Sequence, residues 1–328
     1  MLLLRTIVGA QRACLWCDAT MAKQQKPLSV SHEMIYAGTA ASVAVTVTHP
    51  ADTVKTRMQL LGELATATRP SPYRSTFHCF AETVRTEGMR SLYRGLGTAV
   101  VREFVLNCVR VGLFEPVLTR MHDPADGPAP VHTRFAAGLA TGCCGAIVTN
   151  PLDLLKTRMQ AQAGGANAAV GHQHGYTGIR DGIQRMLTEE GIASAYKGVT
   201  ASMMRLALGS AAQLTAYSWT KEQVLATQRV RDGPLLHIGV SFASVVFGVT
   251  AMQPVDVVRT RLYNQPFDAN TGRGLLYSGP VDAGLKLVRS EGPAALFKGW
   301  LAHYMRGAPH VALLFLTLEQ LKKRRPLD

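Results

Sequence analysis

One eight-residue motif occurs three times in this chain, at residues 50–57, 151–158 and 254–261. Each copy reads proline, any residue, aspartate, two further residues, a lysine or arginine, then threonine and arginine. The prolines that open the copies are 101 and 103 residues apart: Pro50, Pro151 and Pro254. Repetition at such a period indicates three copies of one structural unit of about a hundred residues.

The residue types of the motif predict a bend and a set of ion pairs. Proline inside an apolar helix removes one backbone hydrogen bond and kinks the helix. The acid and the base are three residues apart and therefore lie on one helix face. Three such helices around an axis can close a ring of ion pairs between repeats: Asp52 with Lys156, Asp153 with Arg259, and Asp256 with Lys55. The alternative is that each pair supports only its own helix, for about 0.3–0.5 kcal/mol. The proline before every acid favours the ring.

A second signature keeps step with the first. Glu-Gly is followed in each repeat by an aromatic residue, a base and a glycine, and these glycines are Gly95, Gly198 and Gly299. A tyrosine also recurs before each signature, at Tyr73, Tyr176 and Tyr277.

These residues resemble the threefold signature of the mitochondrial carrier family, solute carrier family 25. The resemblance implies an all-α membrane protein with six transmembrane helices in three pseudo-symmetric repeats, and a short surface helix on the matrix side of each repeat. The expected division is an N-terminal extension at 1–30 and repeats at 31–122, 131–228 and 234–325. The six long helices are expected over residues 31–60, 98–121, 132–162, 201–227, 235–265 and 301–323.

Composition agrees with a membrane bundle around a polar interior. The chain is 47% hydrophobic and 17% charged, yet polar or charged residues interrupt every long apolar run, so hydropathy alone predicts the spans weakly. A water-filled cavity explains inward-facing polar residues. The net charge of +13 fits an anionic membrane surface and an anionic substrate. Nucleic-acid binding is not expected, because no recognition motif or basic tract accompanies the charge.

Several weaker signals predict no further chemistry. Residues 1–28 are basic, which is compatible with a mitochondrial presequence, a disordered extension, or a start at Met21. Cys14 and Cys17 form a single C-x-x-C without the second pair that a zinc site needs. His172 and His174 are expected to be solvated in a loop at 164–175 rather than bound to metal. No catalytic triad, metal cluster or nucleotide loop is present in the sequence, so no enzyme and no cofactor are expected.

The resemblance also implies where a substrate binds. Arg102, Arg205 and Arg306 each follow the second signature by the same interval, at the family's contact points on the even helices. Intramembrane arginines cost about 2.5–3.5 kcal/mol by insertion scales, and guanidinium binds carboxylates bidentately. Arg110 lies two turns above Arg102, with Gln213 as its counterpart in the second repeat.

Glu103 leaves two roles open. It is either a proton-coupling carboxylate or a partner that holds Arg102 in place. Leu206, beside Arg205, argues against amino-acid substrates, because the position carries no acid.

Two gates are expected on the family pattern. The ring described above forms the matrix gate, with Gln59 and Gln160 as braces and Tyr263 in place of the third glutamine. On the cytosolic side only Glu115 with Lys221 makes a complete pair. Three pairs against one predict a substrate-free carrier that rests open to the cytosol.

Lipid sites are implied as well. Gly178 and Gly279 would open surface helices to a phosphate, and Gly95, Gly198 and Gly299 would supply the other half. Cardiolipin is the lipid that the family implies, with a weaker first site because Ser75 replaces the glycine.

Segments 260–266 and 272–277 are similar to the oxaloacetate/sulfate carrier branch, members 34 and 35. The sequence therefore predicts a monomeric, multi-pass transporter of the inner mitochondrial membrane. Its substrates would be small dicarboxylates or oxo-dicarboxylates of the oxaloacetate, malonate or malate type, and also sulfate-type anions. The alternatives are a proton-leak carrier, a transporter of another anionic metabolite, and a non-transporting adaptor.

Overall fold

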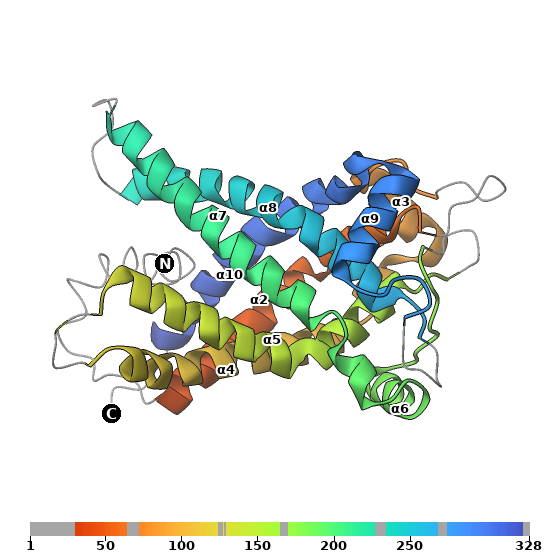
Figure 1. Ribbon diagram of the computed structural model, residues 1–328, viewed down its shortest axis with the longest axis horizontal. Helices are drawn as coiled ribbons and strands as arrows, with labels where there is room; N and C mark the ends of the chain where they lie inside the picture. Colours follow the sequence, from red (N-terminus) through yellow and green to blue (C-terminus); the bar gives the residue numbers. More distant parts are fainter. Residues whose placement is uncertain are drawn as a thin grey trace.

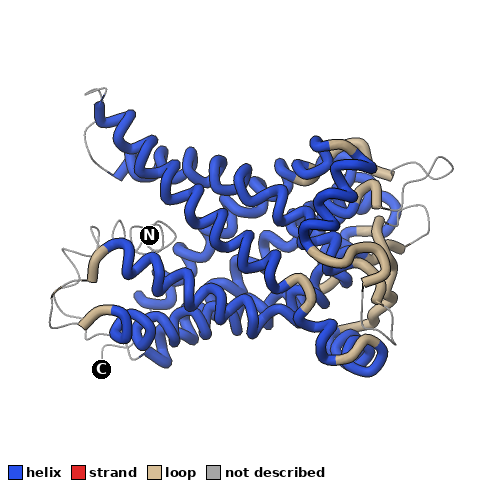
Figure 2. The backbone as a smooth tube through the Cα atoms, in the orientation of Figure 1, coloured by secondary structure: helices blue, strands red, loops and turns tan. Residues whose placement is uncertain are grey.

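The computed structural model describes residues 30–63, 72–123, 127, 129–164, 170–226, 234–267 and 274–323. The expected N-terminal extension, with Cys14 and Cys17, lies outside these residues. Within them the chain is helical, apart from turns and one isolated bridge between Phe267 and Gly274 (Figure 2). The all-α prediction is confirmed.

Six long helices form the body of the molecule: α2 Val30–Leu60, α4 Leu96–Met121, α5 Val131–Ala161, α7 Val199–Ala226, α8 Pro234–Asn264 and α10 Trp300–Lys323. Each begins and ends within two residues of the predicted bounds. The shortest and longest have 24 and 31 residues, or about 36–46 Å at 1.5 Å per residue. That length suffices to cross a bilayer.

Three short helices lie at one end of the bundle: α3 Thr76–Glu87, α6 Ile179–Glu189 and α9 Pro280–Glu291 (Figure 1). We call this the surface-helix end. Each is followed by a 3₁₀ turn that leads into the next long helix: Met89–Tyr93, Ile192–Tyr196 and Pro293–Phe297. The core is densest here, because every residue of α2 from Asp52 to Leu60 is buried.

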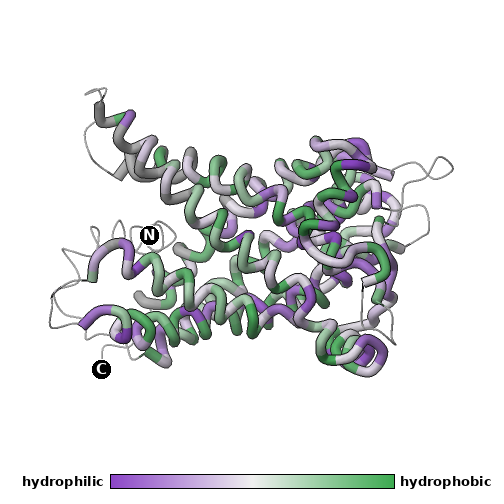
Figure 3. Tube along the Cα trace, in the orientation of Figure 1, coloured by the Kyte–Doolittle hydropathy of each residue, from purple (hydrophilic) through white to green (hydrophobic). Residues whose placement is uncertain are grey.

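Hydropathy along the helices matches the expected weak signal. Figure 3 shows apolar residues along the middle of the long helices and polar residues gathered towards the two ends. By length and composition, one helix among the described residues qualifies as a membrane span, His132–Ala161. The other long helices contain charged residues that line the central cavity described below.

The helix packing departs from threefold symmetry. α10 packs on α2, α2 on α4, α4 on α5, and α7 on α8, each pair along much of its length. The contacts of α5 with α7 and of α8 with α10 are sparse. In Figure 1, α7 and α8 run side by side and lean away from α4 and α5 at the end opposite the surface helices. The bundle therefore consists of a four-helix group and a two-helix group.

The glycines of the second signature join these elements. Gly95, Gly198 and Gly299 have φ of 79°, 73° and 77°, in the left-handed region that favours glycine. A Cβ on Gly198 would stand 2.7 Å from the ring of Tyr263, so a helix of the next repeat also needs the space. The recurrence of glycine at this position in all three repeats therefore has a structural reason that does not involve lipid.

Candidate functional site

A central cavity of about 340 Å³ is lined by all six long helices. Its charged lining comprises seven bases and four acids, an excess of three positive charges: Lys55, Arg102, Arg110, Lys156, Arg205, Arg259 and Arg306 with Asp52, Glu103, Asp153 and Asp256. Fixed cations in a low-dielectric wall attract anions. The cavity is therefore suited to a small anionic solute.

The three predicted ion pairs between repeats are all formed. Lys55 Nζ lies 2.6 Å from Asp256, Arg259 Nη2 lies 2.9 Å from Asp153, and Lys156 is paired with Asp52. Every one of these side chains is at most 11% exposed. We call the six residues the ion-pair ring, and it closes the cavity towards the surface-helix end.

Two glutamines brace the ring as predicted. Gln59 donates to Asp256 at 2.7 Å and accepts from Thr260 at 2.7 Å. Gln160 donates to Asp52 at 3.1 Å and accepts from Thr56 at 2.9 Å. Each glutamine thus adds a hydrogen bond to an aspartate on a neighbouring helix.

The third brace uses different chemistry. The ring of Tyr263 lies 4.6 Å from the guanidinium of Arg259, a cation–π contact. Its hydroxyl is 2.6 Å from Ser202, which accepts a bond from Arg259 Nε at 2.7 Å, and it donates to Asn150 at 2.5 Å. Tyr263 therefore supports the base of the pair, whereas the glutamines support the acid.

The three symmetric arginines all reach towards the ring. Arg102 Nε is 3.0 Å from Asp153, Arg306 Nε is 3.4 Å from Asp52, and Arg205 Nε is 3.6 Å from Asp256. Each ring aspartate therefore faces a ring base and one of these arginines. The sequence predicted the common depth of the arginines but not their attachment to the ring.

Glu103 is 5% exposed and is paired with Arg102. Lys156, Arg306, His310 and Arg110 are also within electrostatic reach of Glu103. Arg102 is thus held between Glu103 and Asp153. Of the two roles that the sequence left open for Glu103, this contact fits that of a partner that holds Arg102 in place.

Arg110 also lines the cavity. Among the described residues, no hydrogen bond or ion pair is found for its guanidinium. The backbone of Gln213 and Lys221 lies on α7, but their side chains fall outside what the structure describes. Glu115 is exposed on α4. The predicted pair of Glu115 with Lys221 therefore stays a prediction.

Cys108 on α4 is not among the residues that line the central cavity. Its thiol contacts the carbonyl of Met34 on α2 at 3.5 Å, so it faces a helix interface.

Sequence reasoning missed the last arginine of each motif. Arg57, Arg158 and Arg261 have side chains at most 2% exposed. They pair with Glu87, Glu190 and Glu291 of their own repeats at 2.6, 2.8 and 2.5 Å. Each also donates across a repeat boundary, to the carbonyls of Gln162, Tyr263 and Leu61. The arginine recurs in every repeat together with the Glu-Gly signature, and this recurrence is the signal that could have predicted the pair.

A polar residue before each kink proline was missed too. His49 contacts the carbonyl of Arg94 at 3.0 Å, Asn150 donates to Ala195 at 2.7 Å, and Gln253 donates to Lys298 at 2.8 Å. These carbonyls belong to the 3₁₀ turns or the residue that follows them. The contacts tie the helix around each proline to the start of the second long helix of the same repeat, which is α4, α7 or α10.

The predicted lipid positions differ among the repeats. Ser75 uses its own side chain to accept from the amide of His78 at 3.2 Å, which occupies an amide at the start of α3. Gly178 and Gly279 have no capping side chain and face open space. A lateral cavity of about 510 Å³ brings Lys197 and Gly198 together with Gly279. Its two halves come from neighbouring repeats, as the family pattern implies.

His174 corrects a prediction. It is stacked on Tyr176 and lies 3.0 Å from the carbonyl of Asn264, so it is a packed residue. Burial lowers the pKa of His174 to about 3. His172 is exposed, as expected. Among the described residues, no group of three or more potential metal ligands occurs.

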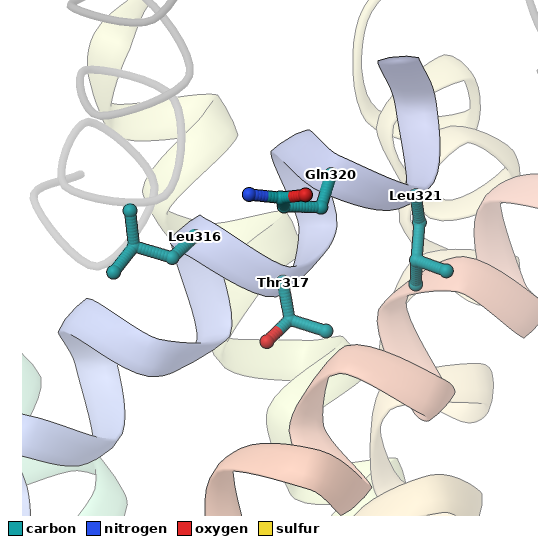
Figure 4. Close-up of a pocket in the computed structure, with 4 residues that line it drawn as sticks. All are labelled: Leu316, Thr317, Gln320 and Leu321. Carbon is teal, nitrogen blue, oxygen red and sulfur yellow. The ribbon is translucent and has the colours of Figure 1, made fainter. Parts of the chain in front are cut away.

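A third pocket lies on α10, where Leu316, Thr317, Gln320 and Leu321 form its wall (Figure 4). It has no charged side chain, so it lacks the fixed positive charge that the central cavity offers to an anion. The central cavity is the better candidate site.

Three helix pairs around a cation-rich cavity, closed at one end by ion pairs, define a membrane transport protein of the three-repeat class. A family model described as "Mitochondrial carrier protein" matches residues 26–124, 127–227 and 231–326. The chain belongs to the mitochondrial carrier family.

Three relatives indicate the range of the family around this chain. It is 35% identical to the mitochondrial oxaloacetate transport protein of Saccharomyces cerevisiae, over 87% of each chain. It is 37% identical to mitochondrial citrate transporter E of Aspergillus niger, over 88% of this chain and 92% of the relative. It is 34% identical to mitochondrial uncoupling protein 5 of Arabidopsis thaliana, over 87% and 95%.

These findings confirm the predicted family and the oxaloacetate-carrier branch. The protein is a multi-pass carrier of small anions in the inner mitochondrial membrane. Members of the family are transporters, which supports the interpretation that this chain is not an enzyme.

Proposed function

We propose that this carrier transports small dicarboxylates or oxo-dicarboxylates of the oxaloacetate, malonate or malate type, and also sulfate-type anions, by alternating access. The observation that carries the proposal is the excess of three positive charges on the cavity wall. The names of two relatives, an oxaloacetate and a citrate transporter, support a carboxylate substrate.

Arg205 and Arg306 are the proposed carboxylate ligands at the centre of the cavity, with Arg110 and Gln213 above them. A guanidinium binds a carboxylate through two parallel hydrogen bonds, which fixes orientation as well as charge. Because Arg205 and Arg306 lie only 3.6 and 3.4 Å from ring aspartates, a substrate that draws them away weakens the ring. Substrate binding and opening of the ring are coupled in this way.

The ion-pair ring is the proposed matrix gate, and Glu115 with Lys221 the cytosolic gate. The surface-helix end then faces the matrix. Pro50, Pro151 and Pro254 lie inside α2, α5 and α8 just before the ring, where each proline removes a backbone hydrogen bond. Small rotations of the segments beyond the prolines would therefore separate the pairs.

A proton-leak carrier is the second candidate, and the similarity to mitochondrial uncoupling protein 5 favours it. It differs in what crosses the membrane. A leak carrier dissipates a pH gradient without a counter-substrate, whereas an exchanger requires one.

The test is exchange in liposomes containing cardiolipin. Labelled oxaloacetate, malonate, malate, citrate, sulfate and phosphate are each offered against unlabelled internal substrate, with an internal pH dye in parallel. The proposal expects saturable uptake of dicarboxylates that needs internal substrate. A dissipated pH gradient without any anion exchange would favour the leak carrier instead.

Cardiolipin is the proposed structural lipid, held by Lys197, Gly198 and Gly279 at the lateral cavity, with equivalent sites at Gly178, Gly95 and Gly299. A monomer is the proposed working unit, because one chain encloses the whole cavity. Native mass spectrometry with cardiolipin and with a neutral phospholipid tests both statements.

A further inference from the structure

The three aspartates of the ion-pair ring are not equivalent. Asp153 faces two guanidinium groups, Arg259 at 2.9 Å and Arg102 at 3.0 Å. Arg102 also places Nη2 at 3.5 Å from the second carboxylate oxygen, so it spans both. Asp52 faces Lys156 at close range and Arg306 at 3.4 Å. Asp256 faces Lys55 at 2.6 Å, and its two arginines are more distant, Arg205 at 3.6 Å and Arg259 at 4.0 Å.

Glu103 explains the closer approach of Arg102. The Glu103 carboxylate is paired with Nη1 of Arg102, and Nε of the same guanidinium lies 3.0 Å from Asp153. Arg205 and Arg306 are followed in sequence by Leu206 and Gly307, which offer no carboxylate. The arginine with an acidic neighbour is the one whose Nε lies closest to the ring.

The position of Asp153 in the bundle gives this contact a consequence. Asp153 is on α5, in the four-helix group, while Arg259 is on α8, in the two-helix group. Direct packing between the groups is sparse along α5 and α7 and along α8 and α10. The Asp153–Arg259 pair therefore ties the two groups together, as the Lys55–Asp256 pair between α2 and α8 also does. Of these two ties, the one at Asp153 is held from the α4 side by Arg102 at 3.0 Å.

We propose that Glu103 and Arg102 form a lock on the matrix gate rather than part of the substrate site. In the lock, Glu103 is a positioning residue that keeps Arg102 on Asp153. The lock stabilises the junction of α4, α5 and α8 in the ring-closed state. The inference rests on the proposed function only in taking the ring as a gate.

The test measures opening of the ring without any substrate. Val245 on α8 lines the cavity, so a Val245→Cys variant reports access to it. The native cysteines are replaced by serine in a background that transports at the wild-type rate. A membrane-impermeant thiol reagent is then applied from the matrix face. Its rate of reaction follows the population of the ring-open state.

Glu103→Gln keeps the shape of the side chain and removes the charge that holds Arg102. We expect matrix-face labelling to rise about tenfold, the effect of about 1.4 kcal/mol on a two-state ratio. Because Arg102 is not a substrate ligand in this proposal, the KM for the transported anion changes less than twofold.

A double-mutant cycle separates the lock from a general loss of stability. If Glu103 acts only through Arg102, adding Glu103→Gln to Arg102→Gln produces no further rise in labelling. Arg102→Gln alone leaves a buried carboxylate without its partner. The double variant therefore restores the thermal stability that the single variant loses, and labelling can be read there.

Glu189→Gln is the matched control. Its partner Arg185 lies 2.9 Å away on the exposed face of α6, with side chains 38% and 56% exposed. The same type of charge loss outside the cavity should leave labelling at the wild-type rate.

Two results would overturn the lock. Loss of uptake driven by a pH gradient in Glu103→Gln, with unchanged labelling, would make Glu103 a proton carrier. A tenfold rise in KM in Arg102→Lys, with unchanged labelling, would make Arg102 a substrate ligand. Labelling needs no substrate, so failure to transport dicarboxylates would leave the result on the lock intact.

Discussion

The buried pair of Arg158 with Glu190 permits a sharp test of what holds the repeats together. Arg158 is 0% exposed and meets both oxygens of Glu190 at 2.8 Å. The same guanidinium donates to Tyr176 at 2.7 Å and to the carbonyl of Tyr263, in the third repeat, at 3.0 Å. Loss of its carboxylate leaves a cation buried without a counter-charge.

Glu190→Gln makes this change with little loss of volume. Removal of one partner of a buried pair costs about 3–5 kcal/mol, and we expect the lower end because the amide oxygen still accepts one bond. A loss of about 3 kcal/mol lowers Tm by about 6–12 °C at about 2–4 °C per kcal/mol. Thermal unfolding of purified carrier in detergent, followed by a thiol-reactive dye, measures the shift.

The neighbouring residue provides the control. Glu189→Gln breaks only the exposed pair with Arg185, for which at most about 1 kcal/mol is expected. The double variant Arg158→Gln with Glu190→Gln removes both charges and should recover at least half of the lost Tm. Equal shifts for Glu189→Gln and Glu190→Gln would refute the reasoning, because burial would then not decide the cost.

Three further predictions concern transport, the resting state and pH. Arg205→Lys keeps the charge but loses the bidentate fork, so liposome exchange should fall at least tenfold at unchanged Tm, and wild-type rates would remove Arg205 from the substrate site. On the family pattern the cytosolic gate would also pair position 118 of α4 with Glu319 of α10, and this chain has Leu118 there. Leu118→Lys adds a base at that position and should move the substrate-free carrier from cytosol-open towards matrix-open, read by matrix-face labelling of Val245→Cys; an unchanged rate would mean that counting gate pairs is no guide. Burial raises the pKa of Glu63, beyond the end of α2, to about 7, so folding takes up a proton there and stability falls as pH rises from about 4.5 to about 7. Glu63→Gln should remove that loss and gain at most about 3 kcal/mol at pH 8, at about 1.4 kcal/mol per pKa unit; identical Tm–pH curves for both proteins would contradict the assignment.

Local pattern was enough to establish the repeats, the helices and the ring. Proline, acid and base at fixed spacing determine which face of a helix carries the charges, because the helical period is a property of the backbone. The predicted bounds of α2, 31–60, therefore match Val30–Leu60 closely. The pairing of Asp153 with Arg259 followed from threefold symmetry alone.

Other assignments depended on distances between helices, which no periodicity contains. Sequence placed Arg102 among three equivalent arginines, whereas the structure holds it on Asp153 through Glu103. It treated Tyr263 as a missing glutamine, whereas the tyrosine hydroxyl contacts Ser202 on α7 and donates to Asn150 on α5.

The last arginine of each motif shows the same limit. Arg158 has its carboxylate 32 residues away on Glu190 and a second acceptor 105 residues away on Tyr263. A short motif determines that a base is present on a given face. Only the packing of three repeats decides which acid it meets, because the free energy of a buried pair depends on separation and desolvation rather than on sequence spacing.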